Sequence, residues 1–209
     1  MYIPPMFQEK STPVLHELIR AHPFATLVTL QRTGLVATHI PMVLHAEAAE
    51  SGVLRGHMAR ANGQWSNLDP SRDALAIFSG VDHYISPSWY PAKQQDGRVV
   101  PTWNYAVVHA YGPLLVHEEP DWLLPHLNSL VNQHEAPFAE PWQVSDAPRE
   151  FVEAQMRAIV GIEIPIRRLE GKWKVSQNRS ERDRQGVSQG LTDLNTEDSL
   201  AMKALVEER

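Results

Sequence analysis

The alternation of apolar and polar positions predicts a chain built mainly of short β-strands. Residues 24–31 and 35–44 are rich in β-branched and aromatic side chains and flank a turn that contains Gly34, a pattern typical of a hairpin. Residues 159–168 alternate so that Ile162, Ile164 and Ile166 fall on one face. By the same criteria, further strands are predicted at residues 53–58, 73–79, 104–117 (interrupted by Gly112 and Pro113) and 172–176.

Helical spacing is found in fewer places. Thr12 offers a capping hydroxyl and Pro13 a first-turn proline, so a helix is predicted to start there and to end before Pro23. Strands that follow one another with few helices between them indicate an antiparallel, mainly β architecture, a barrel with peripheral helices. Further helices are predicted at residues 121–133, 148–157 and 196–206, with a short helix or turn at residues 61–68.

Composition narrows the classes of function. The 209 residues include no cysteine, which excludes disulfides, thiolate metal sites and cysteine nucleophiles. The net charge of −6 argues against a generally basic nucleic-acid binder. Residues 165–186 differ, because seven basic and three acidic side chains give them a local charge of +4. This segment is either a solvated face of mixed sign or an anion site.

The sequence also carries expectations about location. The N-terminus lacks the basic and apolar regions of a signal peptide. No run approaches the roughly 20 apolar residues that span a bilayer. We therefore expect a soluble cytoplasmic protein that makes no membrane contact.

Standard catalytic motifs are absent from the sequence. It contains no dinucleotide-binding glycine pattern, P-loop, zinc-protease helix or serine-hydrolase elbow. Of the ten histidines, His39, His57, His83 and His109 lie on predicted strands or at their ends, and none of these four forms a tight pair with carboxylates at a zinc-like spacing. A strand histidine is more often structural than a ligand. We therefore expect neither catalytic nor metal-binding residues.

Residues 56–65 combine a strand end with a polar turn. The planar guanidinium of Arg60 suits a phosphate, and backbone N–H groups at a following helix start favour the same anion. His57 and Asn62 can add hydrogen bonds. From the residues alone, a phosphate site and a polar strand end with a surface arginine are equally supported.

Two further segments invite a ligand. Residues 83–111 place Tyr84, Trp103 and other rings among small hydroxyls, which suits a planar heterocycle and equally a subunit interface. The two interpretations are compatible if the ligand lies between subunits. Residues 176–184 are either a helix start capped by Asn178 or Ser180, which the residues alone favour, or part of an anion or flavin site.

Several long motifs follow one another along almost the whole chain. They are Met1-Tyr2-Ile3-Pro4, Thr38-His39-Ile40-Pro41, Gly56-His57-Met58-Ala59-Arg60-Ala61-Asn62, Tyr84-Ile85-Ser86-Pro87-Ser88-Trp89-Tyr90, Pro101-Thr102-Trp103-Asn104-Tyr105, Gly161-Ile162-Glu163-Ile164 and Lys172-Trp173-Lys174-Val175-Ser176-Gln177-Asn178-Arg179. In this combination the chain closely resembles the PaiB-type family of FMN-binding transcriptional regulators. One departure is Gly63, which stands where the family pattern has proline; it loosens the turn but removes no functional side chain.

The resemblance implies an antiparallel FMN-binding split β-barrel, related to pyridoxamine phosphate oxidase. It implies one domain over residues 1–209, with an N-terminal helix and a C-terminal helical extension, and a homodimer with FMN at the subunit interface. The ribityl-phosphate end of FMN is expected at Thr38, His39, Ile40, Pro41, His57, Met58, Ala59, Arg60, Asn62 and Trp65. The other subunit or the C-terminal side is expected to supply Trp103, Asn104, Gln177, Asn178 and Arg179.

The family resemblance implies an FMN-linked negative regulator of transcription without dedicated catalytic activity. Direct DNA contact has little support in the sequence, since it shows no helix-turn-helix and only residues 167–184 are basic. The alternative is a flavin-dependent oxidoreductase on the same barrel, although a nicotinamide fingerprint is lacking and only His39, His57 and His109 stand out as proton carriers. A third reading is haem binding, because some split barrels bind haem.

Overall fold

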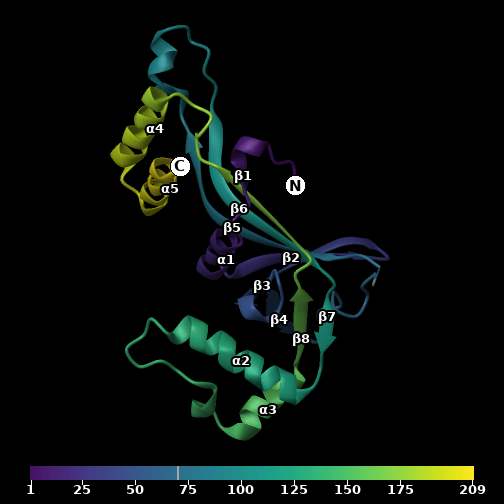
Figure 1. Ribbon diagram of the computed structural model, residues 1–209. Helices are drawn as coiled ribbons and strands as arrows, with labels where there is room; N and C mark the ends of the chain where they lie inside the picture. The colour runs from purple at the N-terminus through teal and green to yellow at the C-terminus, as the bar shows by residue number, and fades with distance from the viewer. Residues whose placement is uncertain (70) are drawn as a thin grey trace. The chain divides into compact units, whose positions relative to one another are not determined.

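A computed structural model describes residues 1–69 and 71–209 of the protein (Figure 1). Its described residues contain five α-helices, α1 (Thr12–Ala21), α2 (Pro120–Glu135), α3 (Arg149–Arg157), α4 (Glu181–Leu194) and α5 (Glu197–Glu208). They contain nine strands, β1 (Gln8–Glu9), β2 (Phe24–Gln31), β3 (Gly34–His45), β4 (Val53–Ala59), β5 (Ala74–Ile85), β6 (Thr102–Gly112), β7 (Leu115–His117), β8 (Ile159–Pro165) and β9 (Arg168–Lys174). Short 3₁₀ turns lie at η1 (Pro5–Phe7), η2 (Ala46–Ala48), η3 (Pro87–Trp89), η4 (Pro91–Gln94) and η5 (Val144–Asp146). None of the described helices is long and apolar enough to cross a membrane.

The strands follow the order β1-β9-β6-β5-β2-β3-β4-β8-β7. The described registers, such as β2 with β3 and β4 with β8, are antiparallel, as predicted. Several strand boundaries differ from the prediction, and β8 ends at Pro165 instead of residue 168. Strand β5 continues past Ser79 to Ile85. The Ile85 side chain is fully buried, and its burial stabilises the longer strand. Strand β9 starts earlier and ends at Lys174, since Ser176 has a left-handed φ of 67° that no strand accommodates.

The chain divides into two compact units. Unit 1 comprises Met1–Leu15, Ser79–Val108 and Glu170–Arg209, and unit 2 comprises His16–Phe78 and His109–Leu169. Each is described by itself below. A single domain over residues 1–209 stays a prediction.

Unit 2 is organised by a bend in strand β3. This strand pairs with β2 as far as Pro41 opposite Phe24, and from Met42 onward it pairs with β4, where Met42 lies opposite Gly56. A side chain at Gly56 would place its Cβ 3.0 Å from the Pro41 carbonyl oxygen, so the close approach at this bend favours glycine. The bend brings the second half of β3 beside the first half of β4. Strand β8 follows β4 along its whole length, and its predicted face of Ile162, Ile164 and Ile166 is buried.

Unit 1 has its own apolar core beneath helices α4 and α5, which lie side by side (Figure 1). The core consists of Ile85, Tyr90, Val175, Val187, Leu191, Met202 and Val206. Thr196 caps α5, as predicted, in a capping box with Ser199. Ser180, one of the two cap candidates that the sequence left open, caps α4. One detail of α5 differs, because Leu200 is exposed and Val206 takes its place in the core.

Candidate functional site

The residues expected to hold the ribityl-phosphate end of FMN all lie in unit 2. Pairing of β3 with β4 brings their two segments together. Strand β3 carries Thr38, His39, Ile40 and Pro41; strand β4 carries His57, Met58 and Ala59; and the turn after β4 carries Arg60, Asn62 and Trp65.

The turn after β4, residues 60–65, is fixed by its own side chains. Asn62 Nδ2 donates to Thr38 Oγ1 at 3.1 Å, which joins the turn to strand β3. Asn62 Oδ1 accepts from the Gln64 backbone N–H at 3.0 Å, and Trp65 Nε1 donates to the Arg60 carbonyl at 2.9 Å. The predicted segments 38–41 and 57–65, which are separate in the sequence, are thus joined by a hydrogen bond.

Gln64 anchors this turn from beneath, and the sequence interpretation gave it no such role. Its side chain is only 2 % exposed. Nε2 donates to the Leu27 carbonyl at 3.2 Å, to Thr29 Oγ1 at 3.0 Å and to the Val36 carbonyl at 3.2 Å. Because each partner belongs to the β2–β3 hairpin, Gln64 fastens the turn to the sheet. No local pattern separates it from the exposed polar residues beside it.

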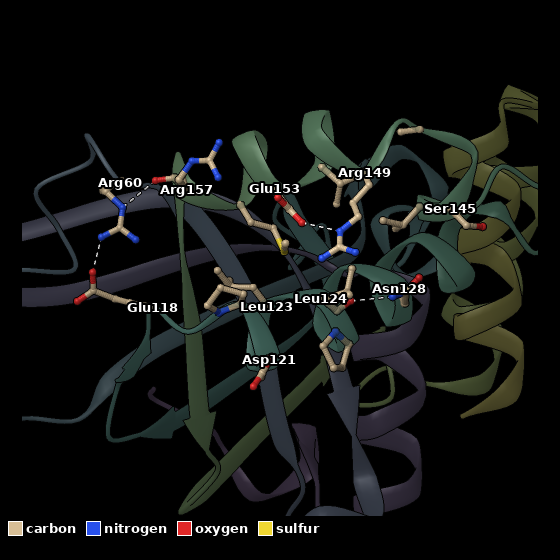
Figure 2. Close-up of a pocket in the computed structure, with 16 residues that line it drawn as sticks. Arg60, Glu118, Asp121, Leu123, Leu124, Asn128, Ser145, Arg149, Glu153 and Arg157 are labelled. Carbon is tan, nitrogen blue, oxygen red and sulfur yellow. Dashed lines mark hydrogen bonds and ion pairs between the residues drawn. The ribbon is translucent and has the colours of Figure 1, made fainter.

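Arg60 is more heavily engaged than a surface phosphate ligand needs to be. Nε donates to the Arg157 carbonyl at 3.0 Å and Nη2 to the Ile159 carbonyl at 3.2 Å, while Nη1 pairs with Glu118 (Figure 2). The guanidinium therefore ties the turn to the end of α3 and to the start of β8. Phosphate binding by Arg60 stays a prediction, and its charge is already shared with one carboxylate.

His57 of strand β4, which is half-buried, pairs with the buried His126. His57 Nδ1 and His126 Nε2 are 3.1 Å apart. His126 comes from α2, is 2 % exposed, and has its pKa lowered to about 3 by burial first and by the neighbouring His57, His45 and Arg55 second. Burial also lowers the pKa of His57. Both rings are therefore neutral near pH 7, and one donates to the other. The burial of His126 could have been predicted from helical spacing, because His126 follows Leu123 by three residues and so lies on the same, buried face of the helix.

Further polar and aromatic groups surround this pair. Trp122 stacks on His117 with 4.4 Å between ring centroids, and Gly161 leaves room for it, since a Cβ there would lie 2.2 Å from the Trp122 ring. Arg55 Nε pairs with Glu163 Oε2 at 2.8 Å. Within residues 1–69 and 71–209, no three His, Asp or Glu side chains are grouped as metal ligands.

The second predicted set lies in unit 1, where polar side chains shape a turn after β9. Asn104 Nδ2 donates to Ser176 Oγ at 2.9 Å. Gln177 Oε1 accepts from the Val175 N–H at 2.8 Å, and its Nε2 donates to the Trp173 carbonyl at 2.6 Å. Asn104 and Gln177 thus hold the left-handed turn at Ser176, while Asn178 is exposed and Arg179 lies with its guanidinium 4.8 Å from the Tyr90 ring centroid.

Lys172 and Lys174, which the sequence placed in the basic segment 165–186 but not among the expected FMN residues, join this set. Lys174 Nζ donates to Thr102 Oγ1 and to the Trp103 carbonyl. Burial, followed by the positive charges of Lys172 and Arg179, lowers the pKa of Lys174. Within the described chain, none of these three cations has a carboxylate at ion-pair distance. Residues two apart on a strand share a face, so the predicted strand 172–176 already placed both lysines on the same side.

Exposed rings accompany these cations. Trp103 is 54 % exposed and meets the ring of Tyr84 edge-on, with 6.1 Å between centroids. Lys172 Nζ lies 5.1 Å from the Tyr105 ring centroid. We call Tyr84, Trp103, Tyr105, Lys174 and Arg179, together with the buried Lys172 beside Tyr105, the aromatic–cationic surface. Flat rings beside uncompensated positive charge suit a planar ligand that carries an anion.

Fold and geometry together define a mainly β protein with a side-chain-fixed turn after β4 and an aromatic–cationic surface. Two solved structures share this fold. A conserved hypothetical protein of Mycobacterium tuberculosis is 14% identical with a TM-score of 0.60, covering 87% of this chain and 95% of its own. The FAD and heme binding protein of Mycobacterium smegmatis is 15% identical with a TM-score of 0.56, covering 80% and 73%.

The family follows from sequence. Residues 1–168 match the family described as "Putative FMN-binding domain", and the chain belongs to this family. Over 209 residues it is 30% identical to "Protease synthase and sporulation protein PAI 2" of Bacillus subtilis, covering all of this chain and 98% of that protein. An uncharacterized protein of Emericella nidulans is 36% identical over 244 residues, covering all of this chain and 97% of its own. The predicted PaiB-type family, split-barrel fold and FMN cofactor are confirmed.

Proposed function

We propose that this FMN-binding protein is a homodimeric, flavin-linked negative regulator of transcription without dedicated catalytic activity. One observation carries the proposed cofactor position. The hydrogen bond from Asn62 to Thr38 joins the two unit 2 segments that the resemblance assigns to FMN. Segments that bind one ligand must meet in space, and these do.

In this proposal, unit 2 holds the ribityl-phosphate end of FMN and the partner subunit supplies the second set. Thr38, His39 and the turn after β4 form the first contact. FMN brings the redox chemistry of its ring when bound, while the chain orients it. The aromatic–cationic surface supports stacking and charge neutralisation, because Trp103 is exposed and Lys174 lacks a carboxylate partner within the described residues.

An apolar sheet face in unit 2 supports the homodimer. Directly opposite residues of antiparallel strands share a face, and Phe24 lies opposite Pro41 while Leu30 lies opposite Leu35. Phe24 is 65 % exposed and Leu35 is 76 % exposed. Exposed apolar side chains gathered on one face mark an interaction site, and a second copy of the chain is the partner we propose for it.

The regulatory part of the proposal rests on the Bacillus relative, whose name refers to protease synthesis and sporulation. Direct DNA contact has little physical support. Arg167 of the basic segment pairs with Asp73 at 3.2 Å, and Arg184 pairs with Glu181 at 3.6 Å. A mobility-shift assay at low salt tests this contact, and absence of a shift would restrict the regulator to indirect action. We place the protein in the cytoplasm, in keeping with its lack of cysteine.

A visible absorption spectrum combined with native mass measurement tests cofactor and assembly together. We expect flavin bands and a mass of two chains with two FMN molecules. A spectrum without flavin after incubation with FMN, or a monomeric mass, would contradict the corresponding part. Steady-state NAD(P)H oxidation with added FMN addresses the oxidoreductase alternative, and turnover there would overturn the non-enzymatic part of the proposal.

A further inference from the structure

Unit 2 contains a large cavity that takes in only one of the predicted FMN residues, Arg60. Its volume is about 1340 Å³, and it opens between helix α2, the 3₁₀ turn η5 and helix α3 (Figure 2). Its apolar wall is formed mainly by Leu123, Leu124, Val144, Val152 and Met156. A concave, mostly apolar site with a few polar groups is the usual form of a small-molecule pocket.

Among the arginines that line the cavity, two have a carboxylate partner and one has none within the described chain. Arg149 Nε pairs with Glu153 Oε1 at 2.7 Å, and Arg60 pairs with Glu118. Arg157 also lines the cavity, and within the described chain its guanidinium has neither a carboxylate partner nor a hydrogen bond. Two guanidinium groups and one carboxylate therefore share the end of the cavity at the last turn of α3.

The carbonyl groups at the C-terminal end of α3 do not balance the charge of Arg157. A cation in a last helical turn is ordinarily stabilised by free carbonyls there. In α3, however, the Gln155 and Met156 carbonyls accept from the Ala158 N–H, and the Arg157 carbonyl accepts from Arg60. Of the acidic side chains that line the cavity, Asp121 is the one not yet paired with an arginine. It lies in the first turn of α2, where the free N–H groups of the helix balance its charge. Figure 2 shows it pointing away from Arg157.

We propose that this cavity binds a small amphipathic monoanion, a carboxylate attached to an apolar chain or ring. The apolar body would lie against Leu123, Leu124 and Val152, and the carboxylate would meet Arg157, with Arg60 and Glu118 beside it. A guanidinium matches a carboxylate in both charge and planar geometry. This function goes beyond FMN binding, and it requires that bound FMN leave the cavity free.

The test compares three eight-carbon probes by calorimetry on the FMN-loaded protein. Octanoate, 1-octanol and octylammonium share an apolar body and differ in charge. We expect octanoate to bind most tightly and octylammonium most weakly. Arg157→Gln should weaken octanoate about five-fold, as expected for a partly exposed charged contact, and leave 1-octanol unchanged. Arg20→Gln is the matched control, because Arg20 is also an exposed arginine in the last turn of a helix, α1, and lies outside the cavity.

Narrowing the cavity provides a second measurement. Leu124 lines it and is 40 % exposed, so Leu124→Trp should cover part of the apolar wall and weaken octanoate binding without disturbing the core. Val152→Trp should do the same from the opposite helix, and melting curves check that both variants fold.

Four outcomes would each overturn the proposal. They are no octanoate binding at millimolar concentration, equal affinity for the three probes, displacement of octanoate by FMN from the flavin-free protein, and loss of self-association in Leu124→Trp. The third would assign the cavity to the flavin, and the fourth would make it an interface between copies.

Discussion

The turn after β4 and the aromatic–cationic surface use similar side chains in opposite ways. In the turn, the side chains of Arg60, Asn62 and Gln64 donate their hydrogen bonds to other protein groups, and Arg60 forms an ion pair with Glu118. On the surface, Lys174 donates only to neutral oxygens, and within the described chain it meets no carboxylate.

The difference bears on how each region can hold an anion. A paired guanidinium offers a phosphate little net charge. The Lys174 ammonium has no carboxylate partner within the described chain, and its pKa is lowered by burial first and by the charges of Lys172 and Arg179 second, so it gains from any anion that arrives. We therefore expect the turn to contribute mainly shape, with a smaller share of the charge from Arg60, and the aromatic–cationic surface to contribute stacking and the larger share of the charge.

The largest effect is expected from Gln64→Leu, which tests the rigidity of the turn. Leucine has a similar volume but leaves the Leu27 and Val36 carbonyls and Thr29 Oγ1 without their shared donor. We expect the free energy of unfolding to fall by about 3 kcal/mol in urea denaturation, the range for buried polar groups left unpaired. Gln185→Leu, at an exposed position of α4, is the control and should change it little. Equal stability of both variants would show that the turn is not anchored through Gln64.

Lys174→Met tests the charge of the aromatic–cationic surface. Methionine keeps the apolar stem and removes the ammonium, so FMN affinity should weaken by about 2 kcal/mol, measured by flavin fluorescence titration. The folded protein should lose little stability, since the substitution also relieves repulsion from Lys172 and Arg179. Lys203→Met is the matched control, because Lys203 lies on α5 of the same unit and faces Glu207. An unchanged affinity in Lys174→Met would mean that FMN draws its charge from elsewhere.

The histidine pair beneath the turn predicts a pH dependence of stability. The folded pKa of His126 is lowered to about 3, so the unfolded chain binds more protons between that value and about 6.5. The stabilisation is complete above pH 6.5 and is lost as the pH falls toward 3. Between pH 7 and pH 5 we expect a loss of about 2 kcal/mol, measured by urea denaturation at each pH. His126→Phe should flatten this dependence, and an equally steep curve in that variant would assign it to other groups.

Local features of the sequence were enough to predict much of the fold. The β2–β3 hairpin follows from alternation around Gly34, and the start of α5 follows from the capping hydroxyl of Thr196, because each signal lies within a few residues of its effect. Strand β9 was misplaced because the left-handed conformation of Ser176 is set by Asn104, 72 residues away in sequence.

The candidate site was predictable as a set of segments but not as a set of contacts. The motifs identified which residues belong together, and the bond between Asn62 and Thr38 agrees with that grouping. The partners of Arg60 lie 58 and 97 residues along the chain, at Glu118 and Arg157, and no local pattern reports such a distance. A motif therefore states which side chains are needed and leaves open whether they face a ligand or the protein.

Arg60 and Glu118 give the smallest and most discriminating effects. If the Arg60 guanidinium contributes charge to the phosphate site, as we propose, Arg60→Ala should weaken FMN binding by about 1.5 kcal/mol. Glu118→Gln frees the same guanidinium from its carboxylate, so FMN should bind more tightly by about 0.5 kcal/mol, the scale of an exposed ion pair. Glu119→Gln is the neighbouring control, because Glu119 makes no ion pair within the described residues. If both Arg60→Ala and Glu118→Gln weaken FMN binding, Arg60 acts by holding the turn in place, since only a structural role needs the arginine and its carboxylate together.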